Sequence, residues 1–283
     1  MFAARLDLLC PLGRTPASSS CIVSNRSNRL SKIVRYTQGG RVSYGLLRQD
    51  SVFQLVGDVF GDFLEGPYVA RADEVTILSP CAPTKIVGVG LNYRAHVEEL
   101  GLQVPDTPLL FLKPPSSVIG PRGEIVFPAS SNELGFSAEL ALVLKRKATG
   151  VSPTEAVECL LGYTCANDVT ARDLARKDTT TTRAKCFDTF CPIGPCVATG
   201  LDAGNLCITS RLNGQVYQRA ETADMVFSVG ELVSFISQVM TLEPGDVILT
   251  GTPQGAGALS VGDVVEVEIE GVGALVNTVV SPR

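Results

Sequence analysis

Short runs in which apolar and polar residues alternate follow one another along most of the chain, and this is the pattern of half-buried β-strands. The early runs are separated by turn signals at Gly39-Gly40 and around Gln49. The predicted strands cover Lys32–Tyr36, Val42–Leu46, Ser51–Leu55, Lys85–Gly90, Phe136–Leu144, Val247–Thr250, Val264–Glu268 and Ala274–Thr278. The pattern therefore predicts a chain built mainly from β-strands.

Helical patterns are few, and capping boxes mark two of them. The box Ser152–Glu155 has a proline at the first helical position and predicts a helix to about Leu161. The box Ser228–Glu231 precedes a helix over Leu232–Met240, which carries an apolar stripe. Because helices do not alternate regularly with strands, a doubly wound parallel sheet is disfavoured. The expected fold class is mainly β with a few helices.

Composition divides the chain into three parts. Residues 1–31 contain four arginines, six serines and one acidic residue, a composition that resembles an organelle transit peptide. The alternative is an upstream start codon or a disordered extension. Residues 32–80 are expected to form a small N-terminal β domain. The linker Pro80–Pro83 then leads to a larger domain, residues 84–283.

Charge and cysteine content exclude several classes of protein. The net charge is −5 and the pI about 5.1, so no nucleic-acid partner is expected. No apolar run is long enough to span a membrane. The nine cysteines include no C-x-x-C pair, and their odd number argues against a disulfide framework. Reduced, buried thiols in the cytoplasm are the expectation, with an organelle matrix as the alternative if residues 1–31 are a transit peptide.

Two carboxylates are candidates for a metal site. Glu139 stands in an otherwise apolar strand, where an unpaired charge would be costly to bury. Asp168 follows about one helix and one strand later, and Lys185 lies beyond it. Carboxylates from separate elements suit a hard cation such as Mg²⁺. Pairing of Glu139 with an arginine in the core would explain the same residue, and the pattern alone leaves both interpretations open.

The sequence contains one histidine, on a short predicted helix. Asn92 is a plausible N-cap for this helix, Tyr93–Leu100, and Gly101 would end it. Lone histidines are often structural. However, Glu99 lies three residues after His96, on the same helix face, and a carboxylate beside an imidazole makes a working general base.

Two glycine-rich stretches share features with nucleotide-binding loops. Gly88–Tyr93 begins like a dinucleotide fingerprint but lacks the third glycine and a surrounding βαβ unit. Thr250–Gly257 follows an apolar strand and lacks the Lys-Ser/Thr of a phosphate-binding loop. It is either a simple turn or a loop whose backbone N–H groups and Thr252 hydroxyl hold a carboxylate.

These residues belong to a series of motifs that resembles the fumarylacetoacetate hydrolase family. The matching stretches run in order from about residue 32 to the end of the chain. They include Gly90–His96 with Glu99, Leu110–Pro114, Ala138–Leu140, Asn167–Asp173, Lys185–Phe190, Leu212–Gly214, Gln218, Met225–Phe227, Leu242–Asp246 and Gly251–Gly255. The resemblance implies a mixed β-roll catalytic domain after a small N-terminal β domain, a homodimer, and a divalent cation, Mg²⁺ with Mn²⁺ or Ca²⁺ as alternatives.

The resemblance also implies roles for individual residues. Glu139 and Asp168 match metal ligands. His96 and Glu99 match a dyad that activates water, and Lys185 matches a lysine that stabilises an enolate. Arg172 and Thr252 match positions near the substrate. The implied activity is hydrolysis, decarboxylation or isomerisation of a small 2-oxo, diketo or enol carboxylic acid.

Two departures from the family pattern weaken the implied metal site. Ser137 stands where the family has the first carboxylate of a Glu-x-Glu pair, and Ala175 stands where it tends to have glutamine. Glu133 is too far along the strand to replace the missing ligand, since six strand residues span roughly 20 Å. The alternative function is therefore a non-hydrolytic family member that binds a dicarboxylate or serves as a structural subunit.

Overall fold

The computed structural model describes residues 30–282, so the interpretation of residues 1–29 lies outside the described part. Within it, strands dominate and helices are short, which confirms the expected mainly β fold class. The helices are α1 (Arg94–Glu99), α2 (Pro153–Glu158), α3 (Arg172–Lys177), α4 (Thr182–Lys185) and α5 (Val229–Val239), with single 3₁₀ turns at Ala72–Glu74, Pro115–Ser117 and Thr222–Asp224.

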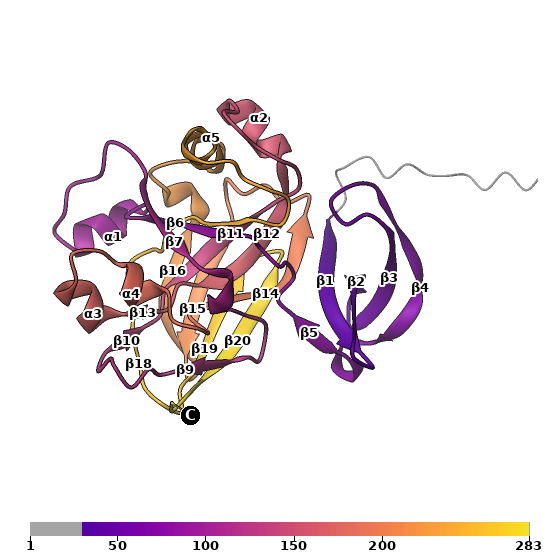
Figure 1. Cartoon of the computed structure of the whole chain (residues 1–283), viewed down its shortest axis with the longest axis horizontal. Helices are drawn as coiled ribbons and strands as arrows, with labels where there is room; N and C mark the ends of the chain where they lie inside the picture. Colours follow the sequence, from indigo (N-terminus) through magenta and orange to yellow (C-terminus); the bar gives the residue numbers. More distant parts are fainter. Residues whose placement is uncertain (1–29, 283) are drawn as a thin grey trace, which may run out of the picture.

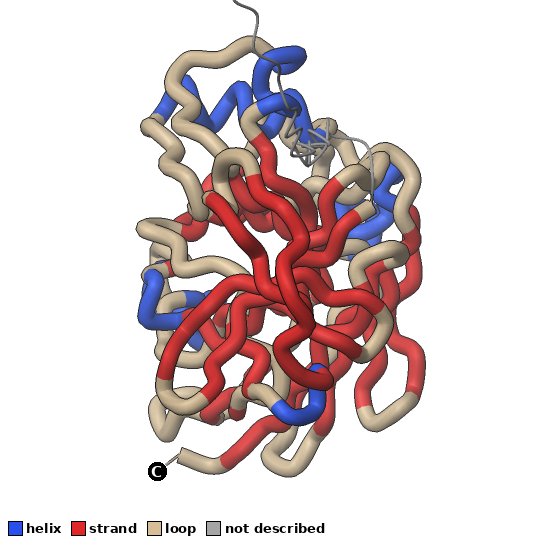
Figure 2. The backbone as a smooth tube through the Cα atoms, turned by 90° about the vertical axis from the view of Figure 1, so that its right-hand side faces the viewer, coloured by secondary structure: helices blue, strands red, loops and turns tan. Residues whose placement is uncertain are grey.

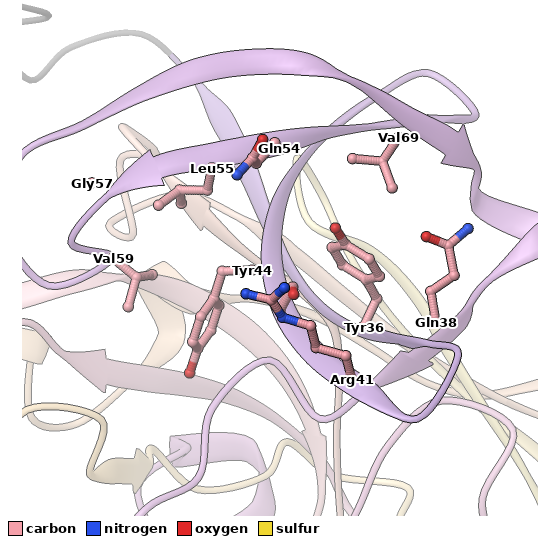
Figure 3. A pocket seen from close by; sticks show the side chains of 10 residues that line it. Tyr36, Gln38, Arg41, Tyr44, Gln54, Leu55, Gly57, Val59 and Val69 are labelled. Carbon is pink, nitrogen blue, oxygen red and sulfur yellow. The ribbon is translucent and has the colours of Figure 1, made fainter.

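The N-terminal strands form an antiparallel meander, as the alternating pattern predicts. They are β1 (Ser31–Gln38), β2 (Arg41–Arg48), β3 (Ser51–Gly57) and β4 (Phe63–Arg71), and β5 (Thr76–Leu78) returns to pair with β1. Figure 1 shows this group to one side of the larger domain. A cavity of about 460 Å³ opens among these strands, lined in part by Tyr36, Arg41 and Tyr44 (Figure 3), and contains none of the predicted site residues.

The meander continues directly into the main sheet of the molecule. The strand order is β4-β3-β2-β1-β14-β12-β11-β17-β6-β7, so β1 joins the two halves by pairing with β14. Figure 2 shows strands filling the centre of the molecule, with the helices nearer its periphery. The remaining members of this sheet are β6 (Ile86–Gly90), β7 (Leu109–Lys113), β8 (Val118–Ile119), β11 (Ala138–Leu144), β12 (Leu160–Asn167), β14 (Cys191–Thr199) and β17 (Val247–Leu249).

Two smaller sheets complete the larger domain. One has the order β16-β15-β19-β20-β9, and its β19 and β20 pack on β12 and β14 of the main sheet. The other has the order β13-β10-β18. The strands are β9 (Glu124–Val126), β10 (Leu134–Gly135), β13 (Thr170–Ala171), β15 (Cys207–Leu212), β16 (Gln215–Glu221), β18 (Ala258–Leu259), β19 (Val264–Ile269) and β20 (Gly273–Val280).

The two predicted capping boxes are confirmed, although the first helix is shorter than expected. Ser152 and Ser228 both accept a hydrogen bond from the backbone N–H three residues on, and each glutamate bonds back. The helix predicted to reach Leu161 ends at Glu158, because Leu160 already begins strand β12. The tertiary pairing of β12 with β11 thus overrides the local helical signal.

The predicted N-cap role of Asn92 is wrong. Helix α1 starts after Tyr93 and has no side-chain cap. The Asn92 side chain instead donates to the carbonyl oxygens of Thr250 and Phe227 and accepts from the Phe227 N–H. A fully buried amide satisfies more groups by joining three separate segments than it would by capping a short helix.

Candidate active site

Glu139 lies in β11, a strand inside the main sheet. Every residue of this strand is buried, and Glu139 is only 2% exposed. Its Oε2 accepts a hydrogen bond of 2.7 Å from the Gly251 N–H, while no described residue donates to its Oε1. Burial, and then the nearby Asp168 charge, raises the pKa of Glu139 to about 8. The arginine partner considered for this residue is absent from its described contacts, so the core ion-pair interpretation is wrong.

Asp168 is brought beside Glu139 by the pairing of β11 with β12. Ala138 lies opposite Asn167 in the ladder, and the Asp168 N–H donates to the Ser137 carbonyl at 2.9 Å. The Lys113 ammonium donates to Oδ1 at 2.6 Å, and the Lys185 ammonium donates to Oδ2. Burial would raise the pKa of this carboxyl, but the two ammonium groups outweigh it and hold the pKa below its ordinary value.

Lys185 is fixed at the end of α4 by three contacts. Besides Asp168, its ammonium donates to the Thr170 hydroxyl at 3.0 Å and lies 4.3 Å from the centroid of the Phe111 ring. The side chain keeps 15% of its surface exposed. A cation held this way can still face a bound anion, which is what a developing enolate requires.

His96 and Glu99 form the pair that their spacing predicts. Nδ1 of His96 lies 3.0 Å from Oε2 of Glu99, and the two side chains are 16% and 44% exposed. The other oxygen of Glu99 accepts a hydrogen bond of 3.1 Å from the Gly255 N–H. The carboxylate is therefore held in place, and the imidazole is oriented with its Nε2 left for a reacting group.

The loop from Thr250 to Gly257 connects both parts of the site. Its N–H groups do hold carboxylates, but these are the chain's own Glu139 and Glu99. Gly251 has φ +95°, and a Cβ there would lie 2.9 Å from the Cβ of Asn92, so only glycine fits the turn. The Thr252 hydroxyl donates to the Ala138 carbonyl at 2.9 Å and accepts from Gln218, beside the strand that carries Glu139.

Arg172 begins α3 and lies across β10. A Cβ on Gly135 would be 2.2 Å from Arg172 Nε, so the absence of a side chain at Gly135 makes room for the guanidinium. Burial lowers the pKa of Arg172, and the charges of Glu133 and Glu99 partly oppose this. Among the described residues its guanidinium has no hydrogen bond or ion pair, so it is free to bind a substrate carboxylate.

Three residues of the site were missed by reasoning from the sequence. Lys113 and Asn92 are fully buried and make contacts that span 55 and more residues of sequence. Tyr93 is 1% exposed, and its hydroxyl has no hydrogen-bond partner among the described residues. The one local signal was the position of Lys113 at the end of an apolar strand.

Two charged oxygen donors lie close enough together to be candidate ligands of a divalent cation. Glu139 and Asp168 offer the hard oxygen atoms that Mg²⁺ and Mn²⁺ prefer. Within residues 30–282, no cluster of three or more acidic, histidine or cysteine residues could hold a metal. Ser137 is partly exposed and adds a neutral hydroxyl. Glu133 pairs with Arg176.

The described cysteines form no disulfide bonds. The seven cysteines of the described part are all free, and burial raises the pKa of Cys81 and Cys191 to about 12. None of the helices between residues 30 and 282 is long and apolar enough to cross a membrane.

Comparison with solved structures finds close relatives of the whole described fold. A 2-hydroxyhepta-2,4-diene-1,7-dioate isomerase from Mycobacterium marinum superimposes with a TM-score of 0.83 at 38% identity, covering 89% of this chain and 98% of that protein. A fumarylpyruvate hydrolase from Pseudomonas aeruginosa, solved with Mn²⁺ and pyruvate, gives a TM-score of 0.67 at 29% identity, covering 71% and 91% of the two chains.

Sequence comparison leads to the same group of enzymes. Human mitochondrial oxaloacetate tautomerase FAHD2A is 43% identical over 227 residues, which are 76% of this chain and 72% of the human protein. The Rv2993c-like N-terminal model matches residues 31–80, and the fumarylacetoacetate (FAA) hydrolase C-terminal model matches residues 85–280. The chain therefore belongs to the fumarylacetoacetate hydrolase family, whose members are enzymes that act on oxo and enol carboxylic acids.

Proposed function

We propose that this protein is a tautomerase or isomerase that moves a proton between carbon and oxygen in a small 2-oxo dicarboxylic acid such as oxaloacetate. The observation that carries the proposal is a set of three features. Lys185 is a cation fixed by its contacts, Arg172 is a cation whose guanidinium has no hydrogen-bond partner among the described residues, and His96 with Glu99 forms a general-base dyad. Keto–enol conversion needs an anion-stabilising cation and a positioned base, and it needs no attacking water. Relatives at 43% and 38% identity carry the names of a tautomerase and an isomerase.

Each side chain has a distinct part in this reaction. Arg172 binds a substrate carboxylate, because its guanidinium has no other partner among the described residues. Lys185 stabilises the enolate oxygen, with Asp168 and Thr170 holding its ammonium in place. His96, oriented by Glu99, takes the proton from the carbon and delivers it to the enolate oxygen, and in the reverse direction it moves the proton from oxygen to carbon. Thr252 borders the bound substrate from the Thr250–Gly257 loop, where its hydroxyl is held by the Ala138 carbonyl.

We further propose that Mg²⁺, or Mn²⁺ or Ca²⁺ in its place, binds at Glu139 and Asp168 with Ser137 or water nearby. When bound, a divalent cation would polarise the 2-oxo and carboxylate oxygens of the substrate. The fumarylpyruvate hydrolase relative was solved with Mn²⁺ and pyruvate, which supports this proposal. The family resemblance also leads us to propose a homodimer that works in the cytoplasm, or in an organelle matrix if residues 1–31 direct it there.

Hydrolysis of an acylpyruvate is the second candidate, and the His96–Glu99 dyad favours it. An imidazole held by a carboxylate can activate water as readily as it moves a carbon-bound proton. A binding or structural subunit without turnover is the third, and Ser137 favours it. These alternatives differ in product and in their dependence on His96.

The test follows oxaloacetate, whose enol form absorbs ultraviolet light more strongly than its keto form. Freshly dissolved enol-oxaloacetate is mixed with protein and Mg²⁺ or Mn²⁺, and formation of the keto acid is read with excess malate dehydrogenase and NADH. We expect faster keto formation, lost in Lys185→Met. Acylpyruvates are tested in parallel. Acylpyruvate cleavage without tautomerisation would replace the proposal by hydrolysis, and no reaction with either substrate would favour the binding protein.

A further inference from the structure

Lys113 is one of the most completely buried charged residues of the molecule. It ends β7, its side chain is 0% exposed, and it lies opposite Ile86 in the ladder with β6. Its ammonium donates to Asp168 Oδ1 at 2.6 Å and to the Val169 carbonyl at 3.1 Å. A lysine buried this deeply persists only where a negative charge compensates it.

Both oxygens of Asp168 are therefore already bound by cations. Lys113 holds Oδ1 and Lys185 holds Oδ2. When Glu139 is ionised, as a bound metal ion requires, the two carboxylates Glu139 and Asp168 stand against two ammonium groups, so their formal charges cancel. A glutamate at position 137 would leave one negative charge in excess; serine leaves none.

We propose that Lys113 is a built-in counter-cation that competes with a divalent metal ion for Asp168, and that it sets the metal affinity of this site. The inference rests on the proposed cation position at Glu139 and Asp168. An ammonium within hydrogen-bond distance of a ligand oxygen is only a few ångströms from any cation bound there, and the repulsion is strong in a buried site. The metal ion must therefore displace Lys113 or bind against its charge.

This competition explains how the site can lose a carboxylate at Ser137 without leaving an uncompensated charge. With serine present, the two ammonium groups are held by Asp168 and no further carboxylate has to be neutralised. The protein then holds its site together in the absence of a divalent ion, and ion binding becomes weak. In such a site, removal of the Lys113 charge should strengthen metal binding. If Lys113 only oriented Asp168, its removal would weaken metal binding instead.

The test measures Mn²⁺ binding by the loss of the free-ion electron paramagnetic resonance signal, on the full chain after chelation and dialysis, without substrate. Lys113→Met and Lys113→Gln remove the charge at similar size, and Lys113→Arg retains it. We expect both neutral variants to bind Mn²⁺ at least tenfold more tightly than the natural chain, and the arginine variant to bind no more tightly. Ser137→Glu should also bind more tightly, because it adds the missing charge.

Two further outcomes separate this inference from the proposed site. If Asp168→Ala leaves Mn²⁺ binding unchanged, the cation position itself is wrong. If Asp168→Ala abolishes binding while both neutral Lys113 variants bind equally or more weakly than the natural chain, the position stands and the competition is refuted. Should the neutral variants fold poorly, recovery of their melting temperature by Mn²⁺ supports the competition, and failure to recover overturns it.

Discussion

The raised pKa of Glu139 predicts an unusual dependence of stability on pH. The carboxyl group titrates near its ordinary value of 4.5 when unfolded and at about 8 when folded, because burial disfavours its charged form. Between these values the folded chain holds a proton that the unfolded chain has released. The contribution of Glu139 to the free energy of unfolding should therefore be fully present below pH 4.5 and decrease as the pH rises towards 8.

The size of the effect follows from the same two values. Each pKa unit corresponds to about 1.36 kcal/mol, so full ionisation of Glu139 would cost ~5 kcal/mol of stability. Asp168 acts in the opposite sense at lower pH, since its pKa is held below the ordinary value and its contribution is lost as the pH falls. Measurements above pH 5 therefore separate the Glu139 contribution from that of Asp168.

The informative comparison is between the natural chain and Glu139→Gln, both in a metal chelator. Glutamine keeps the shape and can still accept the Gly251 hydrogen bond, but it does not titrate. Urea unfolding from pH 5 to pH 9 should show the natural chain losing several kcal/mol relative to the variant. A difference between the two chains that stays constant over this range would refute the assignment of the pKa shift to Glu139.

Three other predictions address the dyad, the guanidinium and the core. His96→Ala should lower turnover by about 10²–10⁴ while Mn²⁺ binding, measured by calorimetry, stays unchanged; full turnover would exclude His96 as the base. Gly135→Ala pushes a methyl group against Arg172 and should raise KM about tenfold (~1.4 kcal/mol) with little change in kcat, and a change in kcat alone would contradict a binding role. Asp246→Ala should lower the free energy of unfolding by about 3 kcal/mol or more, since Asp246 accepts from the Thr84, Lys85 and Glu243 N–H groups; urea denaturation measures this, and a loss below about 1 kcal/mol would show that water replaces those bonds.

Local chemistry could be predicted from the sequence where it depends on short spacing. The His96–Glu99 contact follows from a three-residue separation on one helix, and the two capping boxes follow from the same kind of local rule. The strand alternation also identified Glu139 as an acidic residue in an apolar environment. These features depend on backbone geometry within one element.

Contacts between distant segments could not be predicted in this way. Nothing near Lys113 in the sequence indicates that it meets Asp168, because that contact depends on the order of strands in the main sheet. Asn92 was assigned to the nearest helix since its true partners, Thr250 and Phe227, come more than a hundred residues later. The family resemblance supplied the pairing of Glu139 with Asp168, which the alternation alone left open.

The pairing of β1 with β14 has a consequence for how this protein could be divided. Ile33, Leu46 and Leu55 from the N-terminal meander share one apolar cluster with Ala141 and Val143 of β11, so the core does not separate at the linker. Cutting the chain after residue 80 would leave the side of β14 that faces β1 unpaired at Val197–Thr199 and expose that cluster to water. An open strand of this kind recruits other chains. The N-terminal meander therefore covers a strand that would otherwise promote aggregation, and the rest of the chain should remain monodisperse only while the meander is attached.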